Sequence, residues 1–354
     1  MIREETPIMH PPVEIAVAGV GLIGRRHLEH ILAEPEAALA AIVDPSPAGR
    51  ELAAQHKTPW YPDFAALVAA KKPDGVIFAT PTQLHVAGGL AAVAARIPAL
   101  IEKPIAGDAA EALKLVVAAE TAGIPLLIGH HRRHNPMIQK AKEIVASGRL
   151  GKLVSVHGFF WLMKPDDYFD VAWRRAAGAG PVLTNLIHDI DLMRHLVGEV
   201  ASVQAMSSNA VRGFEIEETA AVLLCFTNGA IGTVNISDTI VAPWSWEQTT
   251  GENPVYPQTD QNCYTIGGTH GSLTVPKLEV WSNAGKRSWW EPLQAQRSYA
   301  AQQDPLRLQI QHFCAVVRGE AKPVVSGREG LQTLRVIQAI KAAAASGMRV
   351  EVAL

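Results

Sequence analysis

The stretch VEIAVAGVGLIGRRH, Val13 to His27, decides the fold of the first part of the chain. A short apolar run suited to a buried strand leads into glycines at 19, 21 and 24, and a helical segment follows from about Ile23. In this context the glycines permit a tight turn, the approach of a pyrophosphate to a helix N-terminus, and close helix packing. The stretch predicts a dinucleotide site at Gly19, Gly21, Leu22, Ile23 and Gly24. The alternative is a glycine-rich turn without a cofactor.

Asp44 is a second indication of a dinucleotide site. It ends the next apolar run, 20 residues after Gly24. A carboxylate at this position accepts hydrogen bonds from the ribose hydroxyls of the adenosine half of the cofactor. It would also repel a 2′-phosphate, and no basic residue follows before Arg50. The sequence therefore favours NAD over NADP.

Short apolar runs and helical segments alternate from Val13 to about His130. Such an alternation is typical of a parallel sheet covered by helices on both faces. We therefore expect an α/β chain, with a Rossmann-type doubly wound parallel sheet over residues 13–130 after a flexible tail at residues 1–12. The dinucleotide site would lie in this domain.

After Gly151 the pattern changes to longer strands in which apolar and polar residues alternate, with a hairpin signal at Asn228-Gly229. We expect an α+β domain over residues 131–354, built on a large, mostly antiparallel open sheet that serves substrate binding and oligomerisation. Two amphipathic helices, at about 305–345, would pack back on the body. A sheet face without helices would otherwise face water, so a homodimer or homotetramer through it is expected.

The composition excludes several classes of partner. The formal charge of -2 gives no broad positive surface for nucleic acid, although His130 to His134, HHRRH, is a local basic cluster. The three cysteines have no CxxC spacing, which points to a reducing, cytoplasmic compartment. No apolar run approaches the roughly 20 residues of a membrane span, so no membrane partner is expected.

Two further motifs follow predicted strands, at the sheet edge where ligands bind in this architecture. Glu102 and Lys103 follow PALI, and Thr80 and Pro81 follow VIFA, with His85 opening the next helix. We expect all five residues to contact the cofactor. A lysine beside a nicotinamide is partly desolvated and close to positive charge, and both effects lower its pKa toward acid/base range. The alternatives are a surface Glu-Lys pair and a histidine that only begins a helix.

These motifs, in order, resemble the Gfo/Idh/MocA oxidoreductases, relatives of glucose-fructose oxidoreductase and inositol dehydrogenase. The resemblance rests on GVGLIG, EKP, GHHRRHNP, AWRRAAGAGPVLTNLIHDID and the closing PVVSGREGLQTLRVIQAIKAAAASG. It implies an NAD(P)-dependent dehydrogenase or reductase of CH-OH groups in a sugar or cyclitol, with the substrate between the two domains. It also implies that Lys103 and His188 flank the substrate hydroxyl and that Trp173 and Arg174 lie near the cofactor.

The chain departs from the family pattern at one position. Polyol-oxidising members commonly carry an aspartate four residues before the histidine, and here Thr184 stands there, followed by Asn185. Both side chains can hydrogen-bond a substrate hydroxyl, but neither accepts a proton as a carboxylate does. The remaining candidates for substrate contact are Arg132, Trp244 and Trp246; the alternatives are a solvated loop for the arginine and loop-pinning or a subunit contact for the tryptophans.

A metal site is a weaker interpretation of the stretch around His188. His188, Asp191 and His195 share one helical face, but apolar residues interleave with them, so we expect no bound metal. Two other functions stay open: a cyclic dihydrodiol dehydrogenase of aromatic catabolism, and a non-catalytic, cofactor-binding regulatory protein.

Overall fold

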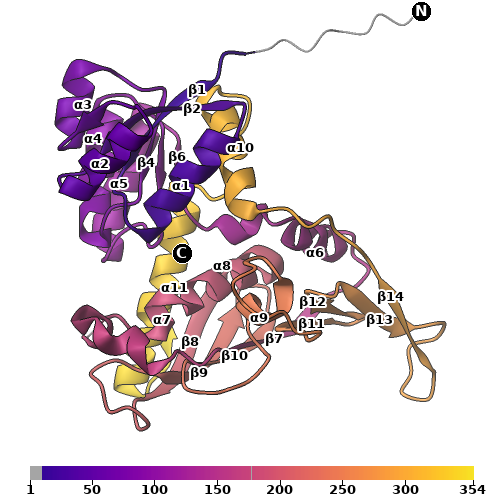
Figure 1. Ribbon diagram of the computed structural model, residues 1–354. Coiled ribbons are helices and arrows are strands. Elements are labelled where there is room, and N and C mark those ends of the chain that lie inside the picture. The colour runs from indigo at the N-terminus through magenta and orange to yellow at the C-terminus, as the bar shows by residue number, and fades with distance from the viewer. Residues whose placement is uncertain (1–9, 177) are drawn as a thin grey trace, which may run out of the picture. The chain divides into compact units, whose positions relative to one another are not determined.

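The computed structural model describes residues 10–176 and 178–354 and divides them into two compact units (Figure 1). The first unit holds the described residues up to His131 together with Leu306–Leu331. The second holds Arg132–Pro305 and Gln332–Leu354. Most of the tail predicted at residues 1–12 lies outside the described residues. Among those residues, no helix has the length and apolar character needed to cross a membrane.

The first unit is built on a six-stranded sheet in the order β3-β2-β1-β4-β5-β6. Every neighbouring pair in it is parallel, so the predicted doubly wound sheet is confirmed. Figure 1 shows helices on both faces of these strands. The strands are β1 (Val13–Ala18), β2 (Ala37–Val43), β3 (Trp60–Tyr61), β4 (Gly75–Phe78), β5 (Ala99–Ile101) and β6 (Leu126–Ile128). The helices are α1 (Leu22–Ala33), α2 (Pro47–Gln55), α3 (Phe64–Ala70), α4 (His85–Ala94), α5 (Ala109–Ala122) and α10 (Pro305–Val317), with a short 3₁₀ turn at Thr82–Leu84.

The apolar runs in the sequence correspond to strands buried on both faces. All residues of β4, β5 and β6 are buried, because helices cover both sides of the sheet. In this strand order the direction of winding reverses between β1 and β4. Ligands of doubly wound sheets bind at such a point, outside the carboxyl ends of the strands.

The second unit is built on a nine-stranded sheet in the order β14-β13-β12-β11-β7-β10-β9-β8-β15. Among the described pairs only β7 and β10 run parallel, so the mostly antiparallel sheet is confirmed. The predicted Asn228-Gly229 hairpin joins β9 to β10, and Gly229 has φ +86°. The strands are β7 (Leu153–Trp161), β8 (Val200–Ser208), β9 (Thr219–Phe226), β10 (Ile231–Ser237), β11 (Tyr264–Gly268), β12 (Ser272–Val275), β13 (Glu279–Asn283), β14 (Leu293–Arg297) and β15 (Val350–Glu351).

Helices cover one face of this sheet. They are α6 (Pro136–Ala146), α7 (Pro181–Thr184), α8 (Leu186–Val197), α9 (Trp246–Thr250) and α11 (Gly327–Ser346), and short 3₁₀ turns lie at His131–His134, Asp166–Asp170 and Ala172–Arg175. Helix α11 begins in the first unit and continues into the second. Side chains of α6, α8 and α11 pack on the inward residues of the strands to form the core.

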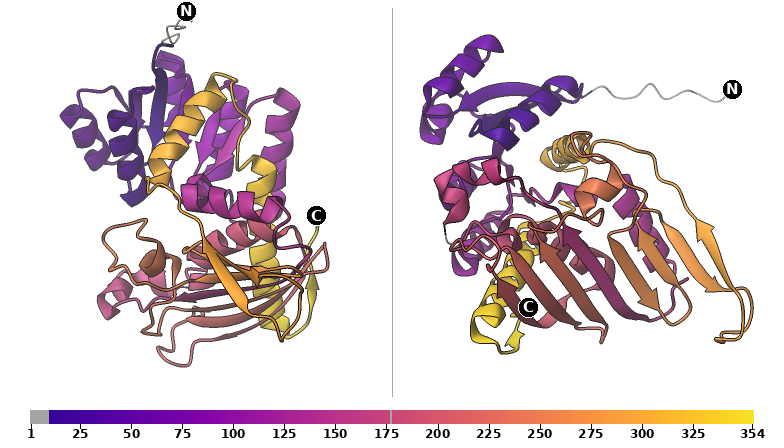
Figure 2. Two further views of the ribbon diagram at one scale, coloured as in Figure 1. Left: turned by 90° about the vertical axis from the view of Figure 1, so that its right-hand side faces the viewer. Right: turned by 60° about the horizontal axis from the view of Figure 1, so that its bottom comes forward.

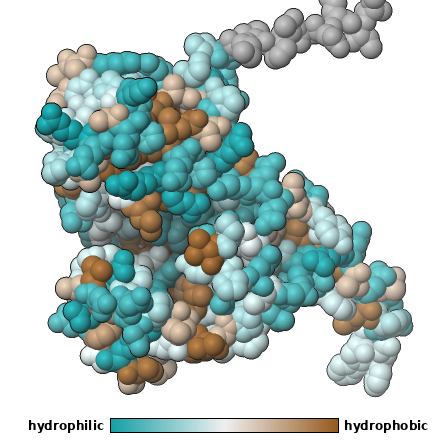
Figure 3. All heavy atoms as spheres, viewed as in Figure 1, coloured by the Kyte–Doolittle hydropathy of each residue, from teal (hydrophilic) through white to brown (hydrophobic). Residues whose placement is uncertain are grey.

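No helix of the described residues covers the other face of the sheet, as Figure 2 shows in its right-hand view. Its outward side chains include Met206 on β8, Leu223 on β9 and Ile231 on β10, which are 78%, 48% and 56% exposed. A depression of about 670 Å³ lies over β7 to β10, lined mainly by apolar side chains. By contrast, on the face seen in Figure 3 hydrophobic residues lie in small groups among hydrophilic ones.

Candidate active site

The three glycines after β1 have distinct surroundings. Gly19 has φ +88°, and a Cβ there would lie 2.6 Å from the Ala79 carbonyl oxygen. A Cβ on Gly24 would lie 2.0 Å from the Gly19 carbonyl oxygen. At Gly21, by contrast, no described atom outside Gly21 and its two chain neighbours lies within 4 Å of the Cβ position, and no described side chain caps α1. This open space at Gly21 in front of the uncapped N–H groups of α1, which we call the glycine cradle, fits a cofactor pyrophosphate.

Asp44 lies at the carboxyl end of β2 and binds the glycine loop. Its Oδ2 accepts a hydrogen bond from Val20 N at 3.0 Å, and its Oδ1 accepts one from Ser46 N at 2.8 Å. The indole of Trp60 donates to the Asp44 carbonyl oxygen at 2.9 Å. The carboxylate is partly exposed and stands beside the loop, as a ribose ligand requires.

Thr80 and Pro81 follow β4, and their loop contacts the glycine turn: Thr80 N lies 2.8 Å from the Cβ position of Gly19. The Thr80 hydroxyl is buried, and no described residue hydrogen-bonds to it. His85 is 1% exposed, and both ring nitrogens lie 2.8 Å from backbone carbonyl oxygens, those of Thr80 and Pro104. In this structure the His85 nitrogens are engaged by the protein itself.

Glu102 and Lys103 follow β5. Glu102 is 5% exposed, and its Oε1 lies 2.7 Å from Nε2 of His27 on α1. Burial raises the pKa of Glu102, but the hydrogen bond from His27 and the positive charges of His27, His131 and Lys103 outweigh burial, so the pKa is lowered. The carboxylate is thus held in the interior by a histidine that sequence reasoning missed, whereas Lys103 is only partly buried. The available signal for His27 in the sequence was its position three residues after Gly24, in GRRH.

His188 lies in the first turn of α8 and is 8% exposed. Thr184 ends α7, and its hydroxyl lies 3.1 Å from the Gly180 carbonyl oxygen and 3.0 Å from Asn185 Oδ1. The one hydroxyl proton is therefore shared between backbone and amide oxygens. Thr184 and Asn185 contact each other just before the helix that carries His188.

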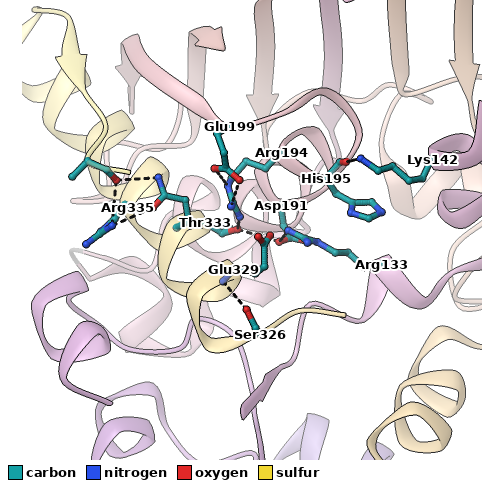
Figure 4. A network of polar contacts seen from close by, with 12 residues as sticks. Arg133, Lys142, Asp191, Arg194, His195, Glu199, Ser326, Glu329, Thr333 and Arg335 are labelled. Carbon is teal, nitrogen blue, oxygen red and sulfur yellow. Dashed lines mark hydrogen bonds and ion pairs between the residues drawn. The ribbon is translucent and has the colours of Figure 1, made fainter. Parts of the chain in front are cut away.

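Asp191, three residues after His188, belongs to a buried network that Figure 4 shows. Arg133 Nε and Nη2 donate to its two oxygens at 2.8 and 2.7 Å, and the Thr333 hydroxyl donates at 3.0 Å. Arg194 continues the network to Thr333 and Glu199. Asp191 therefore ties α8 to the chain at Arg133 and to α11, which is a structural role.

Asp189 points to a second buried cluster. The Tyr264 hydroxyl donates to its Oδ1, and Arg132 Nη1 lies 3.7 Å away. Burial raises the pKa of Asp189 to about 7 although Arg132 and Tyr264 oppose the shift. Arg132 is 4% exposed and also donates to Glu247 at 2.8 Å. The interpretation of Arg132 as a solvated loop residue is wrong, and a role in substrate binding would require this cluster to open.

The two tryptophans of the long loop, Trp244 and Trp246, both pack against other side chains of the protein. Trp246 is 1% exposed and packs beneath the Arg132 guanidinium, 5.0 Å from the ring centre, so it presents no ring face to a ligand. Trp244 packs against Phe159 and Trp161 of β7 at 5.8 and 5.6 Å between ring centres. Phe159 and Trp161 alternate along β7 with its buried residues, so their side chains lie on the uncovered face of the sheet.

Trp173 is 59% exposed, and the Arg174 guanidinium stacks on the Tyr168 ring at 4.2 Å. Sequence reasoning missed a charged cluster nearby. Lys164, after β7, lies 3.3 Å from Asp238, which follows the parallel strand β10. Desolvation by burial lowers the pKa of Lys164 against the charge of Asp238. No local spacing pairs two residues so distant in the sequence.

Among the described residues, no group of three or more His, Cys, Asp or Glu side chains is arranged to hold a metal ion. The polar groups around His188 have other partners. Asp189 contacts Tyr264 and Asp191 contacts Arg133, while the His195 carbonyl accepts a hydrogen bond from Lys142.

Comparison with known proteins matches both parts of the chain. Residues 13–130 match the oxidoreductase family with an NAD-binding Rossmann fold, and residues 138–274 match the GFO/IDH/MocA C-terminal domain. Rhizopine catabolism protein MocA of Rhizobium meliloti is 31% identical over 63% of this chain and 70% of its own. D-apiose dehydrogenase of Rhizobium rhizogenes is 28% identical over 82% and 83%.

A solved structure is similar over almost the whole length. The WlbA dehydrogenase of Bordetella pertussis, in complex with NADH and UDP-GlcNAcA, superposes with a TM-score of 0.79 at 25% identity, covering 97% of this chain and 99% of its own. The Rossmann sheet, the open glycine cradle and these matches together confirm the predicted family. This chain is a member of the Gfo/Idh/MocA oxidoreductase family, with an NAD-binding Rossmann fold.

Proposed function

We propose that this protein transfers a hydride between NAD and a secondary alcohol or ketone of a sugar, cyclitol or related polyol. One observation carries the proposal: Lys103 follows β5 in the unit that also holds the open cradle at Gly21. An amine at this edge of the sheet can exchange a proton with a substrate oxygen. The activity named for D-apiose dehydrogenase supports a polyhydroxylated substrate.

The first unit is proposed to be the cofactor domain. The residues proposed to hold the cofactor are Gly19, Gly21, Leu22, Ile23, Gly24, Asp44, Thr80, Pro81 and, from the second unit, Trp173 and Arg174. When bound, NAD supplies the hydride acceptor. Asp44 makes NAD the proposed cofactor rather than NADP, because its carboxylate would repel a 2′-phosphate. His85 and Glu102 are proposed to support the cofactor site through their buried contacts inside the protein.

The second unit is proposed to be the substrate domain. In the oxidative direction Lys103 takes the hydroxyl proton, and His188 hydrogen-bonds the same oxygen and passes the proton onward. Thr184 and Asn185 hold a neighbouring hydroxyl by hydrogen bonds. In the reductive direction the same groups donate protons. No carboxylate precedes His188 in the chain at the position of Thr184, so the proton passes through an amine and an imidazole.

The test is a screen of NAD reduction and NADH oxidation over sugars, cyclitols, lactones and cyclic diols. On the best substrate Lys103→Ala should lower kcat by about 10²–10⁴-fold, as expected for a positioned acid/base. Lys72→Ala, at an exposed lysine of the same unit, is the matched control and should keep wild-type turnover. Turnover of Lys103→Ala within about tenfold of wild type would remove Lys103 from this role.

The uncovered sheet face is proposed to join copies of this chain into a homodimer or homotetramer. Its exposed apolar side chains and the depression over β7 to β10 support this. Leu223→Lys should lower the mass measured by light scattering to that of one chain. An unchanged mass for this variant would exclude this face as the subunit interface.

The three cysteines form no disulfide in the structure, which supports the expected reducing, cytoplasmic compartment.

A further inference from the structure

His85 lies where two loops of the first unit meet. Its ring is 1% exposed, with Nε2 at 2.8 Å from the Thr80 carbonyl oxygen and Nδ1 at 2.8 Å from the Pro104 carbonyl oxygen. Thr80 belongs to the loop after β4, which touches the glycine turn. Pro104 directly follows Lys103. One side chain therefore connects the loop beside the cradle to the loop that carries the lysine.

The two contacts set a requirement on the ring. A carbonyl oxygen only accepts hydrogen bonds, so each contact needs an N–H on the ring. A neutral imidazole has one N–H, and its other nitrogen would face a carbonyl oxygen with a lone pair. Both contacts are hydrogen bonds only when Nδ1 and Nε2 both carry hydrogen. A neutral ring would leave one of these buried contacts without a hydrogen bond, at a cost of about 1–3 kcal/mol.

We infer that His85 is a positioning residue: as a doubly protonated ring it clamps the Pro104 carbonyl to the Thr80 carbonyl and so fixes the backbone that carries Lys103. This inference rests on the proposed role of Lys103 as the acid/base. The sequence motif suggested that His85 contacts the cofactor, but both nitrogens are already engaged by carbonyl oxygens. His85 instead acts on turnover through the placement of the lysine amine.

The effect of the clamp falls on the chemical step. A misplacement of a catalytic group by about 1 Å can lower a rate by about 10²-fold. His85 takes no part in the contacts of Asp44 with the glycine loop, and at the cofactor site it contacts only the carbonyl of Thr80, so most of that site is unchanged when the ring is lost. Loss of the clamp should therefore lower kcat and leave the dissociation constant for NADH nearly unchanged.

The kinetic experiment compares His85→Gln, which can donate to only part of this geometry, with His56→Gln, at an exposed histidine of the same unit. We expect His85→Gln to lower kcat by about 10–10²-fold with the NADH dissociation constant within about threefold, and His56→Gln to match wild type. A kcat of His85→Gln within twofold of wild type would overturn the clamp. Equal losses in kcat and NADH affinity would also overturn it, since they indicate a general structural role.

The second experiment uses the wild-type full chain with ¹⁵N-labelled histidine. The ring signals of His85, identified by their absence in His85→Gln or His85→Asn, should show hydrogen on both nitrogens. A nitrogen without hydrogen would contradict the inference, whatever the kinetics. This readout also separates the two hypotheses: if Lys103→Ala keeps its turnover, the proposed function of Lys103 fails, while the ring signals still decide whether the clamp exists.

Discussion

Asp191→Asn tests whether the aspartate after His188 holds the fold or takes part in the reaction. The carboxylate and Arg133 are 1% and 3% exposed and share two hydrogen bonds, at 2.8 and 2.7 Å. Asparagine keeps the shape but offers one acceptor oxygen, and its amide hydrogens face the guanidinium. Two charge-assisted hydrogen bonds are worth about 3–6 kcal/mol, and breaking a buried ion pair costs about 3–5 kcal/mol. We therefore expect a loss of about 3–5 kcal/mol in the free energy of unfolding.

Urea unfolding followed by tryptophan fluorescence measures this loss. Seven of the eight tryptophans lie in the second unit, all except Trp60, so the signal reports mainly on the unit that contains Asp191. In the absence of urea, kcat should stay within about tenfold of wild type, because Asp191 is committed to Arg133 and Thr333. A loss of stability below about 1 kcal/mol together with a kcat lowered by more than about 10²-fold would refute the structural role.

Three more predictions concern the glycine loop, the cofactor and pH. Gly21→Ala should keep wild-type stability and abolish NADH binding, whereas Gly24→Ala, whose Cβ would meet the Gly19 carbonyl, should destabilise the fold; isothermal titration and urea unfolding distinguish them. Asp44→Ser should weaken NADH binding by about 10–10²-fold and reduce the difference between the affinities for NADH and NADPH. An unchanged ratio of the two affinities would contradict the role of Asp44. Asp189 has its pKa raised by burial to about 7 in the folded state against 3.8, so it holds a proton there that the unfolded chain releases, and its contribution to stability falls as pH rises from about 4 to 7. Asp189→Asn should therefore gain stability relative to wild type by at most about 1.4 kcal/mol per pH unit in this window, and a gap that stays constant between pH 5 and 7 would exclude the shift.

The first unit was predictable because its signals are local. The turn at Gly19, the N-terminus of α1 at Gly21 and the carboxylate of Asp44 lie on consecutive elements, and each apolar run marks a strand buried on both faces. The family motifs EKP and HDID likewise point to Lys103 and His188, whose roles in the reaction stay predictions. What these motifs could not say is which polar side chains contact each other inside the fold.

The contacts that sequence reasoning missed join residues far apart in the chain. Glu102 is 75 positions from His27, and Tyr264 is 75 positions from Asp189. No spacing rule relates such pairs, because their proximity is created by the packing of whole elements. The same limit applies to the tryptophans, because a loop rich in aromatic residues suits sugar binding or anchoring equally. Burial beneath Arg132 indicates an anchoring role for Trp246, and substrate contact by Trp244 stays a prediction.

The hydrogen bond from the Trp60 indole to the Asp44 carbonyl gives the first unit a built-in optical probe. Trp60 is the one tryptophan of the sequence in that unit, and it stands beside the residue proposed to hold the adenosine ribose. The difference between the emission spectra of wild type and Trp60→Phe isolates its fluorescence from that of the other seven. Quenching of this component by NADH would measure occupancy of the first unit without labelling and without turnover.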